Sequence, residues 1–127
     1  MKLPHKQWRV VHTMRCSDDN GIGFINMPSL YHFPNKHAAE QSVQHRQALD
    51  LNAFGDNDKM TYEIFPVMRH HIDDHYEWDY RDCRIIANPK GNRFKAIRDN
   101  HMIVRRHHIY DVFADIDQML LNEKHMR

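Results

Sequence analysis

"DCRIIANPKGNRFKAIRDNHMIVRR", residues 82–106, contains three short segments of strand-forming residues divided by two turn sequences. The turn sequences consist of residues that favour chain reversal, because proline restricts φ, glycine relaxes it, and Asn and Asp bond to their own backbone. Runs of this length bounded by such residues are typical of hairpin-linked strands. The pattern predicts a three-stranded antiparallel meander, with strands at 82–88, 93–98 and 101–106 and turns at 89–92 and 99–100.

The segment that follows, residues 107–125, has the clearest helical periodicity in the chain. Asp111 near its start and Lys124 near its end carry the charges that the helix dipole favours at those positions. Its apolar residues recur at helical spacing and fall on one face: Ile109, Val112, Phe113, Ile116, Met119 and Leu120. The carboxy-terminal half is therefore predicted to be β-β-β-α.

The amino-terminal half begins with strict alternation over residues 8–15, which has the period of two that a strand requires. Turn residues at 17–21 precede a second predicted strand at 22–33, interrupted at Pro28. A helix is predicted over 34–52, with Asn35 as its N-cap and Gly55 as its stop signal, and a third strand over 60–70. This half is predicted to be β-β-α-β.

The predicted fold class is α+β, with two small lobes that pack together. A β-β-α-β lobe covers residues 1–70, an acidic, histidine-rich connector covers 71–82, and a β-β-β-α lobe covers 83–127. About sixty residues alone bury only a marginal core, so neither lobe is expected to stand by itself. One compact domain with a shared sheet is the alternative.

Composition limits the classes of function. No run of eighteen apolar residues occurs, so no membrane-spanning helix and no membrane partner are expected. The start of the chain has no apolar stretch of signal-peptide length, and its two cysteines, Cys16 and Cys83, are expected to be thiols, so a cytoplasmic location is predicted. No nucleophile elbow or phosphate-binding glycine loop occurs. The chain is thus expected to be non-catalytic and to need no cofactor.

Charge is unevenly distributed although the chain carries only +1 overall. Residues 84–106 contain seven basic residues and one acidic residue, whereas residues 49–83 contain three basic and nine acidic residues. Exposed charges act appreciably only within about 10 Å at ordinary salt, so a local basic block attracts an anion even in a neutral molecule. Alternatively, the basic block pairs with the acidic block and holds the halves together.

Alternation divides the meander into two faces. One face is predicted to point toward the final helix and carries Phe94, Ala96, Met102 and Val104. The other mixes cations with isoleucines and carries Arg93, Lys95, Ile97, His101, Ile103 and Arg105. A fully solvated face seldom carries such isoleucines, so this one is either a partner surface or partly covered.

The favoured hypothesis is a small intracellular binding protein that contacts nucleic acid or a nucleoprotein through this basic sheet face. A small antiparallel sheet backed by a helix has a layout analogous to the sheet-type DNA readers of phage integrases and plant transcription factors, although no motif of those families occurs. The residues predicted to meet phosphates are Arg84, Lys90, Arg93, Lys95, Arg105 and Arg106.

Two other hypotheses stay open. The small size and uneven charge also suit a protein-binding accessory or inhibitor protein, of the kind that phages encode against host complexes, and a homodimer is a further arrangement. The stretch "RHHIDDHYEWDYRD", residues 69–82, supplies imidazole and carboxylate ligands for a metal-dependent enzyme. Its candidate ligands are His70, His71, Asp73, Asp74 and His75. No metal site is predicted there, because a polar connector explains the same composition.

Overall fold

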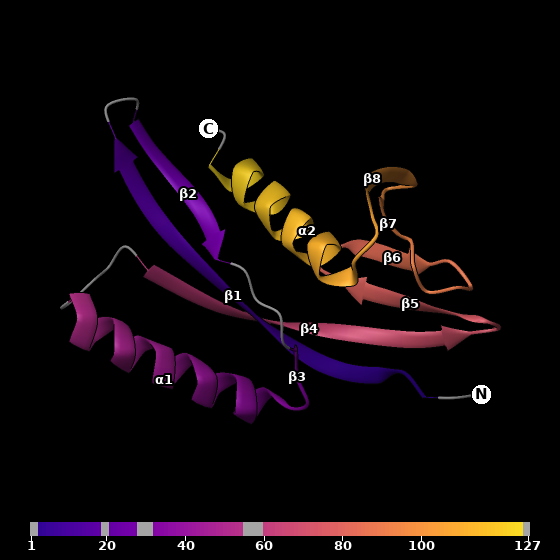
Figure 1. Cartoon of the computed structure of the whole chain (residues 1–127), viewed down its shortest axis with the longest axis horizontal. Coiled ribbons are helices and arrows are strands. Elements are labelled where there is room, and N and C mark those ends of the chain that lie inside the picture. Colours follow the sequence, from indigo (N-terminus) through magenta and orange to yellow (C-terminus); the bar gives the residue numbers. More distant parts are fainter. Residues whose placement is uncertain (1–2, 19–20, 28–31, 55–59, 126–127) are drawn as a thin grey trace.

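A computed structural model describes residues 3–18, 21–27, 32–54 and 60–125. It confirms the predicted α+β class: a curled antiparallel sheet with one helix in mid-chain and one at the carboxy-terminal end (Figure 1). The elements are β1 (His5–Asp18), β2 (Gly21–Met27), β3 (His32–Phe33), α1 (Lys36–Phe54), β4 (Met60–Ile72), β5 (His75–Tyr80), β6 (Cys83–Ala87), β7 (Phe94–Arg98), β8 (His101–Arg106) and α2 (Ile109–Lys124).

The sheet is continuous through both predicted halves. Its strand order is β2-β1-β4-β5-β6-β7-β8, with β3 paired to β1. Residues 71–82, which were expected to link two lobes, form the end of β4, the β4–β5 turn, β5 and the β5–β6 turn in the middle of the sheet. The reason is the alternation of buried Trp78 and Tyr80 with less buried Glu77 and Asp79, which is a strand pattern within a polar composition. The lobe boundaries themselves stay a prediction.

The two helices cover opposite faces of the sheet, as the neighbours Trp8 and Arg9 in β1 demonstrate. The Trp8 ring lies 5.7 Å from the Lys36 Nζ of α1, whereas Arg9 bonds to Asp117 of α2. Successive side chains of a strand point to opposite faces, so we name these the α1 face and the α2 face. Because α1 lies against β1, β3 and β4, neither described helix covers the α1 face of β5–β8 (Figure 1).

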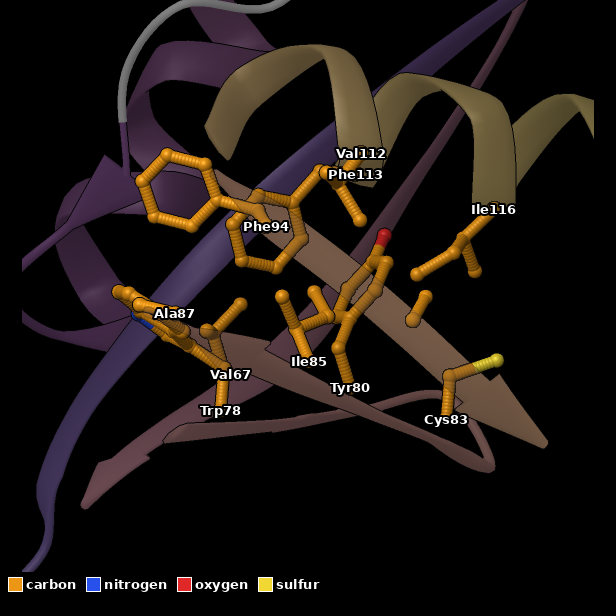
Figure 2. Close-up of a cluster of buried hydrophobic side chains, with 11 residues drawn as sticks. Val67, Trp78, Tyr80, Cys83, Ile85, Ala87, Phe94, Val112, Phe113 and Ile116 are labelled. Carbon is orange, nitrogen blue, oxygen red and sulfur yellow. The ribbon is translucent and has the colours of Figure 1, made fainter. Parts of the chain in front are cut away.

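The main core lies between α2 and the α2 face of β4–β7 (Figure 2). Ile85 and Ile116 are fully buried there, and burying a side chain of this size stabilises a fold by about 1.5–3 kcal/mol. The core residues are Val67, Trp78, Tyr80, Cys83, Ile85, Ala87, Phe94, Ala96, Val112, Phe113 and Ile116. The predicted apolar face of the last helix is confirmed, since Ile109, Met119 and Leu120 pack against the same cluster.

The predicted faces of Met102 and Ile103 are wrong, and so is that of His101, which pairs with Arg98 on the α2 face. Ala96 pairs with Val104 and Ile97 pairs with Met102, which leaves Ile103 as an extra residue in a bulge of β8. A bulge interrupts the alternation of side chains, so Ile103 packs against the core while Met102 is 55% exposed. Strict alternation, on which the sequence prediction relied, does not continue across the bulge.

Two other predictions from the local sequence, an N-cap and a two-residue turn, are confirmed. The Ala38 N–H donates to Asn35 Oδ1 at 2.8 Å, as expected of an N-cap. Asp99 and Asn100 both have positive φ, of 52° and 65°, in the predicted two-residue turn. The predicted break at Pro28, the centre of the turn at 17–21 and the stop at Gly55 lie outside the described residues. Neither described helix is long and apolar enough to cross a bilayer.

Candidate functional site

Two rows of directly paired side chains cross the α1 face of β5–β8. Residues opposite each other on neighbouring strands point to the same side of a sheet. The first row is Glu77, Ile86, Lys95 and Arg105, and the second is Asp79, Arg84, Ile97 and Met102. We call these eight residues the open face.

The β5–β6 end of the open face is a network of paired charges. Arg84 Nε lies 2.6 Å from Asp79 Oδ1, and its Nη1 lies 3.0 Å from Glu77 Oε1. Histidines contact the remaining oxygens, with His70 Nε2 at 2.7 Å from Asp79 Oδ2 and His75 Nε2 at 2.8 Å from Glu77 Oε2. The pairing of basic with acidic residues that the sequence left open therefore holds for Arg84.

The electrostatics of this network follow from its hydrogen bonds. Although partial burial acts in the opposite direction, hydrogen bonds from His75 and Arg84 lower the pKa of Glu77 below its ordinary value. Hydrogen bonds to Glu77 and Asp74 raise the pKa of His75. Both effects favour the charged forms, so the carboxylates at this end are neutralised by their neighbours.

The β7–β8 end of the open face carries two cations side by side. Lys95 of β7 and Arg105 of β8 are Cα partners, and both side chains are exposed. Like charges directly opposite each other in a sheet are destabilising. Neither has an ion pair with any residue in the described part of the chain, and the same is true of Lys90 and Arg93 in the preceding turn.

Arg106, in contrast, belongs to the opposite face. Its Nε lies 2.6 Å from Asp115 Oδ2 of α2. Arg98 is held in the same way, with its Nη1 at 2.7 Å from Glu123 Oε1 of α2. Of the six predicted phosphate contacts, the structure thus brings Arg93, Lys95 and Arg105 together, with Lys90 in the adjoining turn. It separates Arg84 and Arg106 from them by engaging each with a carboxylate.

The three clustered cations line a hollow of about 260 Å³ at the end of β6 and β7. Its apolar lining comes from Ile86, Ala87 and Phe94, and Asn88 completes the wall. The sequence prediction named the cations but not Phe94 or Asn88. Phe94 was assigned wholly to the core, where its ring does lie 5.9 Å from the Trp78 ring.

Asn88 organises the turn that carries Lys90 and leads to Arg93. Its Oδ1 accepts from the Asn92 and Arg93 N–H groups, each at 3.0 Å, and its Nδ2 lies 2.7 Å from Asn92 Oδ1. The Gly91 N–H donates to the Asn88 carbonyl at 2.9 Å, with Gly91 at φ +69°. An Asn before a Pro-Lys-Gly turn was a signal available in the sequence, because Asn commonly bonds the backbone of its own turn.

The candidate metal ligands are not gathered at one point. His70 and His75 contact different carboxylates, and the His71 ring lies 4.9 Å from the Tyr76 ring. Asp73 occupies the exposed β4–β5 turn with φ of 53°. Among the described residues, no group of three or more His, Cys, Asp or Glu side chains is arranged to hold a metal ion.

Cys83 is a buried free thiol, and burial raises its pKa. That environment disfavours the reactive thiolate form. The side chain of Cys16 lies outside the described residues.

Comparison with known proteins adds no family assignment: no family model, curated protein or solved structure matches the chain. The arrangement of the site is therefore the basis for any functional conclusion.

Proposed function

We propose that the chain binds nucleic acid through the β7–β8 end of the open face. The observation that carries the proposal is the pairing of Lys95 with Arg105, two exposed cations held side by side without a carboxylate among the described residues. Such a pair costs stability in the free protein and is relieved by an anion. Arg93 and Lys90 extend the same positive region into the Asn88 turn.

The remainder of the open face is compatible with a polyanion. Glu77 and Asp79 are its acidic members, and both are engaged by Arg84 at 2.6–3.0 Å. They therefore repel an approaching phosphate less than free carboxylates would. Phosphate contacts supply sequence-independent affinity, which weakens steeply as salt rises.

The test compares two charge-matched double variants. In the first, Lys95→Ala and Arg105→Ala remove the unpaired cations; in the second, Arg106→Ala and Lys124→Ala remove the same charge from positions outside the open face. Binding of a fluorescently labelled oligonucleotide is followed by anisotropy at several salt concentrations.

We expect the wild-type and the control variant to bind with a similar salt dependence, and the first variant to bind more weakly. Each lost phosphate contact lowers the slope of log K against log salt by about 0.7–0.9, so the first variant should lose roughly 1.5 from its slope. Absence of salt-dependent binding in the wild type, or equal weakening in both variants, would contradict the proposal.

A protein partner is the second candidate, and Met102 is the observation that favours it. This side chain is 55% exposed beside Ile97, on the edge strand β8. Exposed apolar groups and unpaired strand edges are common features of protein interfaces. The accessory, inhibitor and homodimer hypotheses predict that Met102→Asp abolishes a specific co-purifying partner or a dimer seen by light scattering. A monomer that captures nothing specific from its natural host would remove them.

A further inference from the structure

We propose that the hollow between Arg93, Lys95 and Arg105 receives one unstacked base of a single-stranded nucleic acid. The neighbouring phosphates then lie on the cations of the rim. This inference rests on the proposed function and names its substrate class, single strand rather than duplex.

The size of the hollow favours one base. Its volume of about 260 Å³ is slightly below the range of about 300–1,000 Å³ that is usual for small-molecule sites. A base in a duplex is paired and stacked, and it enters a pocket only after it is extruded, which costs the energy of unpairing and unstacking. A base in a single strand avoids most of that cost, so the hollow discriminates in favour of single strands.

The lining of the hollow also fits a base together with its phosphate. Ile86, Ala87 and Phe94 contribute apolar surface within reach of three cations. A bare anion gains nothing from apolar surface, whereas a base gains from being removed from water. The guanidinium groups of Arg93 and Arg105 add planar cations on which a base stacks.

The hollow offers little means of reading sequence. Asn88 is the amide in its wall, and both ends of that amide are engaged in the turn, with Asn92 and with the Arg93 N–H. Stacking and apolar contact tolerate every base because each has a π-face. We therefore expect only a weak base preference.

The experiment uses the full chain and three labelled probes of equal length. These are oligothymidylate, an abasic strand with the same number of phosphates, and the duplex of oligothymidylate with oligoadenylate. We expect oligothymidylate to bind about tenfold more tightly than the abasic strand, as stacking of a base on a protein surface predicts. It should also bind more tightly than the duplex.

A matched pair of variants locates the effect. Ile86→Lys replaces apolar lining with a cation, and Ile97→Lys makes the same change on the open face outside the hollow. Both add one positive charge at partly exposed positions, so both should fold and bind the abasic strand at least as well as wild type. Ile86→Lys should lose the preference for oligothymidylate over the abasic strand, and Ile97→Lys should retain it.

The outcomes separate this inference from the proposed function. Salt-dependent binding that is equal for oligothymidylate and the abasic strand, or as tight for the duplex, would overturn the base site and leave nucleic-acid binding standing. A base preference retained by Ile86→Lys, or lost equally in both variants, would also overturn it. Failure of every probe to bind would remove the proposed function, and the base site with it.

Discussion

Arg9 of β1 and Asp117 of α2 form a buried ion pair, with Arg9 Nε 2.9 Å from Asp117 Oδ2 across 108 residues of sequence. Each side chain is only 2% exposed. The other oxygen, Asp117 Oδ1, accepts from the Tyr80 hydroxyl and, at 3.0 Å, from Arg81 Nη1. One carboxylate thus joins the first strand, the β5–β6 turn and the last helix. It also supports Arg81, whose backbone has φ of 44°.

Asp117→Ala should strongly destabilise the protein. Removing one partner of a buried ion pair leaves the other charge without compensation in the interior, which costs about 3–5 kcal/mol of unfolding free energy. Urea denaturation measures the change. Asp115→Ala is the matched control on the same helix, because its partner Arg106 is 52% exposed and such pairs contribute about 0–1 kcal/mol. Equal losses in the two variants would mean that the Arg9–Asp117 pair is not buried in solution.

His32 should make the protein less stable in acid. Burial and the neighbouring Arg9 lower the pKa of His32 from 6.5 to about 4, consistent with its Nε2 lying 3.4 Å from Arg9 Nη1. Because the pKa of His32 is lower in the folded than in the unfolded state, the folded protein binds this proton less readily. The contribution of neutral His32 to the unfolding free energy is therefore complete above about pH 6.5 and is lost as pH falls through about 4.

The gap between those two pKa values corresponds to roughly 3 kcal/mol. The unfolding free energy of wild type and His32→Gln should therefore converge as the pH is lowered across that interval, which denaturation at a series of pH values tests. Parallel curves would show that the His32 ring is solvated.

Tyr62 should make the protein less stable in alkali. Partial burial, together with the hydrogen bond that its hydroxyl donates to Asp50 of α1, raises the pKa of Tyr62 to about 12. A raised pKa stabilises the fold below about pH 10, and that contribution disappears as pH rises through 12. Absorbance titration should find a tyrosine ionising near pH 12 that is missing from Tyr62→Phe. An unchanged titration in the variant would argue against contact between β4 and α1 at this point.

Gly91→Ala should destabilise the Asn88 turn by about 1–2 kcal/mol, because an L residue with a side chain disfavours the φ of +69°. Apart from Gly91 and its two chain neighbours, no described heavy atom lies within 4 Å of the position that an added Cβ would occupy, so the cost is one of backbone conformation. Gly23→Ala is the control, since it also has open space but no positive φ. It should be neutral or slightly stabilising. Thermal unfolding of the two variants would contradict this expectation if their melting temperatures changed equally.

Features encoded over a few neighbouring residues were predictable. The meander follows from its turn residues, the last helix from the spacing of Ile109, Val112 and Phe113, and the start of α1 from Asn35. Such signals act through local backbone preference and side-chain periodicity, which do not depend on the remainder of the chain. The grouping of Arg93, Lys95 and Arg105 around the hollow likewise follows from their positions along the short β7–β8 hairpin.

Features that depend on distant partners were not predictable. No local pattern indicates that Arg9 meets Asp117, that β4 and β5 join the halves in one sheet, or that a bulge turns Ile103 inward. The same holds for the cations: Arg84 and Arg106 carry the same charge as Lys95 and Arg105, yet packing places carboxylates beside the first two. A charge in the sequence becomes a binding group or a structural one according to its neighbours in space, since Coulomb energy depends on distance and burial and not on position along the chain.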